Sequence, residues 1–185
     1  AMYADTVHQY SNAGYFNYLN NGVTNGWDWY EVDGGRQDFM NYFKLCREST
    51  IELSNTKIPN PTTLPGFWND NKSSLINYIK QSLYGLRGIV TDSITGQPLK
   101  ARVEIFGHDY DSSHVYSNLP VGNYHRYIDQ GNYLFNFSCS GYQSKSVDVA
   151  INNSSTTILD VQLIPNSYVG ICLLYTSPSP RDTLL

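Results

Sequence analysis

Glu52 is the side chain of this sequence with the clearest potential for chemistry. It lies in the run TIEL (50–53), where polar and apolar residues alternate as they do along a strand with one buried face. An ionised carboxylate among apolar side chains is costly to bury, and burial raises its pKa toward the range of a general base at neutral pH. The alternative is that Glu52 points into solvent or pairs with Arg47 or Lys57.

Tyr30 is the second candidate. It lies in the Gly- and Asn-rich stretch 20–35, which reads NNGVTNGWDWYEVDGG and contains two Asn-Gly turn signals. Aromatic side chains on a loop flanked by glycines often cover a site. The phenol is a neutral donor at pH 7, so it could hydrogen-bond a substrate. Because the chain has 16 tyrosines, ordinary packing is the alternative.

The histidines and the acidic residues near them give no metal-binding spacing. The four histidines lie at positions 8, 108, 114 and 125, and none belongs to H-E-x-x-H or to another zinc motif. Asp109 and Asp111, close to His108, could hold a cation through their oxygens. A solvated turn is the alternative for this pair.

Four Asn-x-Ser triplets begin at Asn71, Asn136, Asn152 and Asn153. Such sequons accept N-linked glycans in a eukaryotic secretory pathway. In a chain rich in Asn and Ser they also arise by chance.

The composition limits the classes of function. The chain has 185 residues, which is enough for one medium domain or two small ones. A net charge of −4 gives no basic footprint for nucleic acid, and no apolar run approaches the roughly 20 residues that span a bilayer. Three widely spaced cysteines exclude a disulfide framework. We expect a secreted protein, extracellular or periplasmic, whose signal peptide is not in this sequence.

The elements that must position Glu52 and Tyr30 are expected in the first 85 residues. The period-two pattern of residues 45–54 predicts a strand, with Ile51 and Leu53 on one face. The stretch 69–84 predicts an amphipathic helix, because apolar residues repeat there at helical spacing. We expect a polar cap at residues 69–71 and a stop at Gly85.

From residue 86 to about 164, apolar and polar residues alternate with a period of two. Five stretches predict short strands separated by turns: 86–92, 101–107, 132–142, 145–151 and 156–164. Strands at this spacing indicate a small all-β sandwich or barrel. The final stretch, residues 171–185, differs in character from the rest, and we expect it to be a non-native tail.

The order of motifs resembles the C-terminal part of the zinc metallocarboxypeptidases, in the branch of carboxypeptidases N, E, D and M. The resemblance is carried by NGWDWYEVDGGRQDFMNYFKLCRESTIELSNTKIP (25–59), then by the helical stretch, then by the glycine-rich pattern of the β stretches. It implies a partial α/β catalytic segment over residues 1–85, a mixed sheet with covering helices. An all-β transthyretin-like sandwich, also called carboxypeptidase regulatory-like, follows over residues 86–165. Residues 166–185 remain as the tail.

The resemblance also implies roles for five residues. Glu52 takes the position of the general base, which removes a proton from a zinc-bound water and delivers it to the leaving amine. Tyr30 matches the mobile tyrosine that closes over the substrate. Gln37 matches a position in the pocket for the substrate's terminal side chain, and Trp29 and Thr50 are expected to line the same pocket.

The resemblance places the zinc ligands upstream of this sequence, because nothing here matches the H-x-x-E pair of the family. We therefore expect Zn²⁺ in the full-length parent but no metal ligand, and no catalysis, in this fragment alone. The expected partners are a peptide or protein C-terminus as substrate and the upstream half of the catalytic domain. Arg36 departs from the branch, which usually has Met at that position.

Two other functions stay open. The β-sandwich and the aromatic loop could form a non-enzymatic binding module, or the parent could be a catalytically dead homologue. A glycosidase would need a carboxylate pair in one cleft, such as Glu52 with Asp38 or Glu48. Along one strand, Glu48 would lie about 13 Å from Glu52, which is too far for that chemistry.

Overall fold

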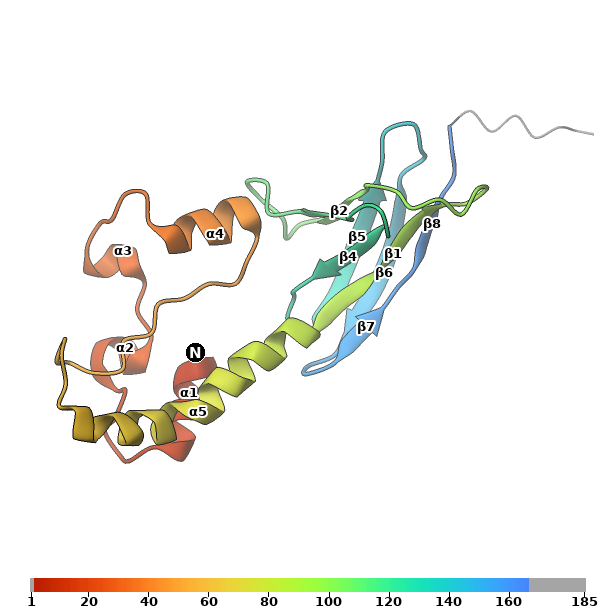
Figure 1. The fold of residues 1–185 in the computed structure, drawn as a ribbon. Helices are drawn as coiled ribbons and strands as arrows, with labels where there is room; N and C mark the ends of the chain where they lie inside the picture. The colour runs from red at the N-terminus through yellow and green to blue at the C-terminus, as the bar shows by residue number, and fades with distance from the viewer. Residues whose placement is uncertain (1, 167–185) are drawn as a thin grey trace, which may run out of the picture.

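The computed structural model describes residues 2–166, apart from the side chain of Trp29. It is elongated, with a helical region (residues 2–84) at one end and a β module (residues 85–166) at the other, joined where a long helix runs into the first strand (Figure 1). The tail predicted over residues 171–185 lies outside the described residues.

The helical region contains five α-helices and two 3₁₀ turns. In chain order these are α1 (Met2–Tyr10), α2 (Tyr18–Gly22), α3 (Gly26–Trp29), α4 (Arg36–Lys44), η1 (Pro61–Thr63), α5 (Leu64–Lys80) and η2 (Gln81–Leu83). The predicted helix at 69–84 is thus confirmed as α5, but it begins earlier, at Leu64. Pro65 lies in its first turn, where the missing N–H of proline costs no helical bond.

The strand predicted over residues 45–54 is wrong, and with it the mixed sheet expected in residues 1–85. No strand occurs in the described residues before Gly85. An extended segment becomes a strand only when a neighbouring strand pairs with its backbone groups. Here side chains take that place: Asn41, Tyr78 and Tyr15 bond the backbone at Glu48, Arg47 and Leu53, respectively.

The β module contains eight strands in two sheets, so the predicted β-sandwich is confirmed, while its transthyretin-like topology stays a prediction. The strands are β1 (Gly85–Asp92), β2 (Arg102–Ile105), β3 (Val115–Tyr116), β4 (Asn123–Arg126), β5 (Gly131–Ser138), β6 (Lys145–Ile151), β7 (Thr156–Ile158) and β8 (Val161–Leu163). One sheet has the order β4-β1-β7, with β8 also paired to β1, and the other has the order β3-β2-β5-β6.

The stretch predicted as one strand at 156–164 is two strands, β7 and β8, and both run parallel to β1. They are separated where the Leu159 carbonyl packs against Gly88, leaving no room for a Cβ at that glycine. The Asp160 carboxylate accepts a hydrogen bond from the Ile89 backbone N–H at 2.9 Å. A side chain thus replaces a ladder bond at the break.

Alternating residues of the two sheets meet in one apolar core. Its thirteen buried members are Leu86, Val90, Leu99, Ala101, Val103, Ile105, Tyr124, Phe135, Phe137, Val149, Ile151, Val161 and Leu163. Beside this core lies a buried ion pair between Arg126 and Asp109. Burial lowers the pKa of the Arg126 guanidinium, and the Asp109 carboxylate opposes that change.

The junction between the two regions is built around Gly85. The helical turn η2 ends at Leu83, and β1 begins at Gly85, whose φ of 98° suits glycine. The Gly85 N–H donates to the Ser155 carbonyl at 3.1 Å, and the Thr156 hydroxyl donates to the Leu83 carbonyl. The turn between β6 and β7 therefore lies against the end of the helical region.

Candidate functional site

Two of the predicted pocket residues lie in contact. The Thr50 hydroxyl donates a hydrogen bond of 2.8 Å to the side-chain oxygen of Gln37. Gln37 lies in the first turn of α4, and Thr50 lies on the extended segment 45–54. The hydrogen bond therefore joins two residues that are 13 positions apart in the sequence. The structure therefore brings these two side chains to one place, as a shared pocket wall requires.

Asn41, one turn further along α4, holds the extended segment against the helix. Its side-chain nitrogen donates to the Glu48 carbonyl at 2.8 Å, and its oxygen accepts from the Glu48 N–H at 3.1 Å. The Arg36 guanidinium also forms an ion pair with the Glu48 carboxylate at 2.5 Å. Side chains of α4 thereby fix the stretch that leads to Thr50.

A second set of polar contacts holds the other end of the segment. The Tyr15 hydroxyl donates to the Leu53 carbonyl at 3.0 Å and accepts a hydrogen bond of 2.8 Å from the Asn71 side chain. Asn71 is only 1% exposed, and its side-chain oxygen accepts from the Tyr3 hydroxyl at 3.0 Å. This relay, which is buried at Asn71, connects α1 and α5 to the residue that follows Glu52.

Burial raises the pKa of both phenols of this relay. It raises the pKa of Tyr3 to about 12, and the neighbouring Tyr15 adds to the rise. Burial likewise raises the pKa of Tyr15 above its ordinary value, although the hydrogen bond from Asn71 opposes this. A tyrosine hydroxyl is a hydrogen-bond donor at neutral pH even at its ordinary pKa near 10, and the raised pKa extends that role to more alkaline pH.

Glu52 lies between Thr50 and the anchored Leu53, and its side chain is exposed. It forms no ion pair with Arg47, with Lys57 or with another residue that the structure describes. In the described structure Glu52 therefore faces solvent instead of an apolar pocket.

Tyr30 caps the C-terminal end of α3, where its N–H donates to the Gly26 carbonyl at 3.1 Å. Its side chain is 57% exposed, and the glycine pair that follows, Gly34 and Gly35, leads into α4. The predicted Trp29 lies in α3, and its side chain is not among those described.

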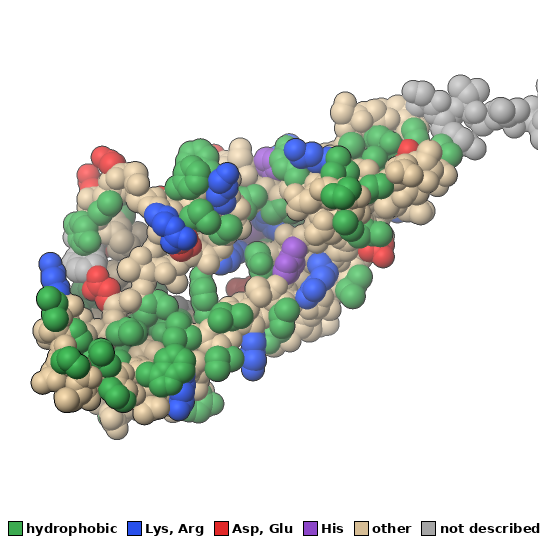
Figure 2. Space-filling view, in the orientation of Figure 1, with side chains coloured by type: hydrophobic (Ala, Val, Ile, Leu, Met, Phe, Trp, Pro, Cys, Tyr) green, Lys and Arg blue, Asp and Glu red, His purple; other side chains and the backbone are tan. Residues whose placement is uncertain are grey.

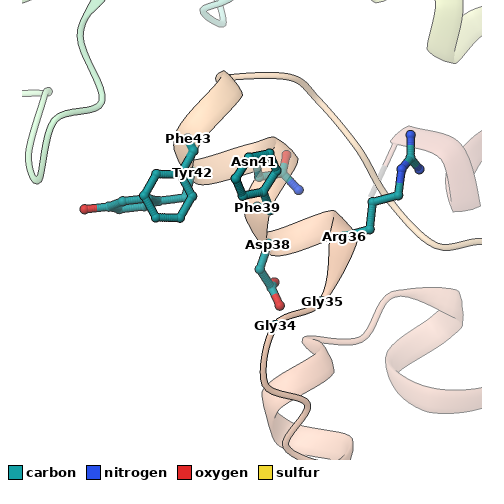
Figure 3. Close-up of a pocket in the computed structure, with 8 residues that line it drawn as sticks. All are labelled: Gly34, Gly35, Arg36, Asp38, Phe39, Asn41, Tyr42 and Phe43. Atoms are coloured by element: carbon teal, nitrogen blue, oxygen red, sulfur yellow. The ribbon is translucent and has the colours of Figure 1, made fainter.

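An aromatic surface on α4 was not predicted from the sequence. Phe39, Tyr42 and Phe43 lie next to one another, with ring centroids 5.3 Å apart for Phe39–Phe43 and 4.9 Å apart for Tyr42–Phe43. They line an open pocket of about 990 Å³ together with Gly34, Gly35, Arg36, Asp38 and Asn41 (Figure 3). The spacing 39, 42, 43 is the helical signal that could have revealed this face.

No group of three or more His, Cys, Asp or Glu side chains able to hold a metal ion occurs in the part of the chain that the structure describes. The described residues therefore do not fit a zinc site by themselves. Within the same residues, no helix is long and apolar enough to cross a membrane.

Comparison with known proteins shows which family the chain is similar to. Residues 1–74 match the model of the zinc carboxypeptidase family, which covers the Gln37–Thr50 contact, Glu52 and the Asn71 relay. The resemblance to zinc carboxypeptidases predicted from the motifs is thereby confirmed.

Individual relatives agree with the family match. The chain is 33% identical over 148 residues to carboxypeptidase E of Caenorhabditis elegans, covering 78% of this chain and 31% of that protein. It is 38% identical over 138 residues to carboxypeptidase M of Mus musculus, covering 73% of this chain and 30% of that protein. The chain thus spans less than a third of the length of these two relatives.

Likeness to solved structures is much weaker. The Bacillus anthracis TIE protein, for example, is 16% identical with a TM-score of 0.37, covering 45% of this chain and 17% of that one. A score this low supports no argument about fold or function.

Proposed function

We propose that this chain is part of a secreted, zinc-dependent metallocarboxypeptidase that hydrolyses the C-terminal residue of peptides. The family match and the carboxypeptidase relatives support the class of enzyme. The observation that carries the proposal is the hydrogen bond between Thr50 and Gln37, because it joins two residues that the resemblance assigns to one substrate pocket.

Gln37 and Thr50, with Trp29, are proposed to form a wall of the pocket for the substrate's last side chain. Thr50 uses one lone pair of the Gln37 oxygen, which leaves a second lone pair and two N–H donors on that amide. A neutral wall with a free acceptor suits a cationic side chain, which brings several donors of its own. Basic C-terminal residues are therefore the substrates that we favour.

Glu52 is proposed to act as the general base. Its carboxylate would take a proton from the attacking water and pass it to the nitrogen of the leaving amine, and the Tyr30 hydroxyl would donate a hydrogen bond to the substrate's peptide group. A carboxylate does this well only when it is partly desolvated. The proposal therefore requires that another part of the whole enzyme covers Glu52, which is exposed here.

The apolar surface of the helical region supports such a covering partner. Among the side chains described before Gly85, only Ala4 and Val7 are buried hydrophobic residues, whereas Trp27, Phe43 and Trp68 are mostly exposed. We propose that the upstream half of the catalytic domain packs on this surface and supplies the zinc ligands. We assign no step to the metal, and we expect this chain alone to bind zinc weakly and to hydrolyse nothing.

The decisive experiment uses the full-length parent enzyme and peptides that end in Lys, Arg or Leu. Glu52→Gln should lower kcat by about 10²–10⁴-fold, the usual contribution of a general base, while zinc content stays at the wild-type level. Glu31→Gln is the matched control, because Glu31 is also an exposed glutamate of this region. Full activity in Glu52→Gln would refute the proposed role.

The exposure of Glu52 also favours a second candidate, a carboxypeptidase-related protein without catalytic activity that acts as a binding module. The same assay separates the two. A zinc-loaded wild-type parent that cleaves no peptide at any pH tested supports the second candidate.

A further inference from the structure

The four Asn-x-Ser sequons lie in very different structural settings. We propose that the turn between β6 and β7, residues 152–155, is an N-glycosylation site that carries one glycan on Asn152 or Asn153. This inference rests on the proposed secretory location, but it does not depend on peptidase activity.

The turn has the exposure that a glycan needs. Asn152 and Asn153 are both exposed, and neither side-chain nitrogen donates a hydrogen bond to a residue that the structure describes. The turn leaves regular pairing after Ile151 and re-enters it at Thr156, with Ser154 at a φ of 53°. N-linked glycans are bulky and occur on surface loops of this kind.

The Asn71 sequon is incompatible with a glycan in the folded chain. Its side-chain nitrogen donates to the Tyr15 hydroxyl at 2.8 Å and to the Phe67 carbonyl at 2.9 Å, so both of its hydrogens are in use. A glycan would replace one of them in a site that is 1% exposed. Glycosylation there would leave buried polar groups unpaired and would separate α1 from α5.

The Asn136 sequon lies in the middle of β5, a strand paired on both sides by β2 and β6. The Asn136 oxygen accepts a hydrogen bond of 3.2 Å from the Ser146 hydroxyl on β6. The central residue of this sequon is Phe137, which is fully buried in the core. The triplet cannot leave the strand without unpacking that ring.

The reaction is an ordinary group transfer. The donor is an oligosaccharide linked to a lipid diphosphate, as found in the lumen where secreted proteins fold. The asparagine nitrogen forms a bond to the anomeric carbon, the bond from that carbon to the diphosphate oxygen breaks, and the lipid diphosphate departs. The nitrogen loses one proton, so no oxidant or reductant is needed.

A glycan at this turn would stand beside the junction of the two regions. Ser155 accepts the Gly85 N–H, and in Figure 1 the loop before β7 lies at the end of the β module that faces α5. The sugar would extend into solvent there.

The test expresses the whole chain behind a cleavable secretion signal in cultured animal cells. Soluble protein is digested with peptide:N-glycosidase in heavy-oxygen water, which converts each glycosylated Asn into labelled Asp that mass spectrometry can locate. We expect label on Asn152 or Asn153 and none on Asn71.

The variants Ser73→Ala and Ser138→Ala remove the other two sequons while keeping Asn71 and Asn136, and both should leave the glycan in place. Asn152→Gln combined with Asn153→Gln should abolish it. The label at the turn is also located in the cell lysate, so a variant that folds poorly still gives an answer. An unlabelled turn in the wild type, or a glycan that persists on the soluble double variant, would overturn the proposal.

The added secretion signal directs the chain into the lumen. Absence of a glycan would therefore show that the turn at residues 152–155 is not an acceptor. Loss of peptidase activity in the full-length parent would instead concern the proposed function, and the two failures are distinguishable.

Discussion

The two regions of this molecule bury their apolar side chains to very different extents. The β module encloses thirteen hydrophobic residues in one core, whereas Ala4 and Val7 are the only buried hydrophobic residues among the described side chains of the helical region. Figure 2 shows apolar side chains gathered over the surface of the helical region, and Ile79 on α5 is 68% exposed. Burial of apolar surface is the main favourable term in folding. The β module is therefore stabilised by its own hydrophobic core, whereas the helical region depends on polar contacts.

What replaces a core in the helical region is a set of hydrogen bonds between distant segments. The relay from Tyr3 through Asn71 and Tyr15 to Leu53 spans most of that region, and Asn41 closes α4 onto the extended segment. Each such bond contributes only about 0.5–1.5 kcal/mol net. A region held in this way positions side chains but resists unfolding weakly.

The largest expected effect on stability is that of a substitution in the core of the β module. Phe135→Ala removes a fully buried ring that lies against Phe137, with centroids 6.5 Å apart. We expect it to lower the free energy of unfolding by about 3–5 kcal/mol, because the cavity adds to the lost transfer energy. Urea denaturation followed by circular dichroism measures this.

The matched variant is Phe43→Ala on α4, where the ring is 67% exposed. It should change stability by less than about 0.5 kcal/mol. Equal effects of the two substitutions would show that the helical region does have a core of its own.

A smaller effect is expected at Asn71. Asn71→Ala removes the group that bonds both Tyr3 and Tyr15, leaving their hydroxyls partly buried without that partner. We expect a loss of about 1–3 kcal/mol in the stability of the helical region. Amide hydrogen exchange should also become faster around Leu53, because Tyr15 loses its anchor.

The control for that variant is Asn69→Ala, since Asn69 contacts only the exposed Lys72 among the contacts described on α5. It should leave exchange around Leu53 unchanged. Equal exchange rates in Asn71→Ala and wild type would mean that the relay does not position the segment.

The smallest expected effect is a pH dependence at Asp92. Hydrogen bonds from the Thr95 and Ile94 N–H groups, and then from the Tyr142 hydroxyl, lower the pKa of Asp92 below its ordinary value. A carboxyl whose pKa is lower in the folded state adds stability above its unfolded pKa, near 4, and loses it as pH falls through the folded value. Asp92→Asn should therefore narrow the difference in Tm between neutral and acid pH.

Asp148→Asn provides the control for Asp92, because Asp148 is an exposed carboxylate on β6 of the same module. It should leave the pH dependence of Tm close to that of the wild type. If Tm depends on pH in the same way in Asp92→Asn and in the wild type, the ionised Asp92 carboxylate does not stabilise the turn at residues 92–96.

Much of the fold was determined by local sequence pattern. The period-two stretches of the β module all became strands, and the helical period at 69–84 became α5. Two short strands were not predicted: β3 has only two residues, and β4 buries Tyr124 and Arg126, so it shows no alternation of apolar and polar residues. The resemblance of residues 25–59 to the carboxypeptidase motifs also named Gln37 and Thr50, which the structure brings into contact.

The tertiary structure decided what local pattern cannot encode. Residues 45–54 alternate as a strand does, yet they pair with side chains instead, because a strand exists only with a partner. The buried face of α5 is formed by Asn71 and Ser74 against α1, while the apolar Ile79 points outward. Which face of an element is buried depends on what lies opposite, and residues such as Tyr3 and Asn71, 68 positions apart, meet only once the chain has folded.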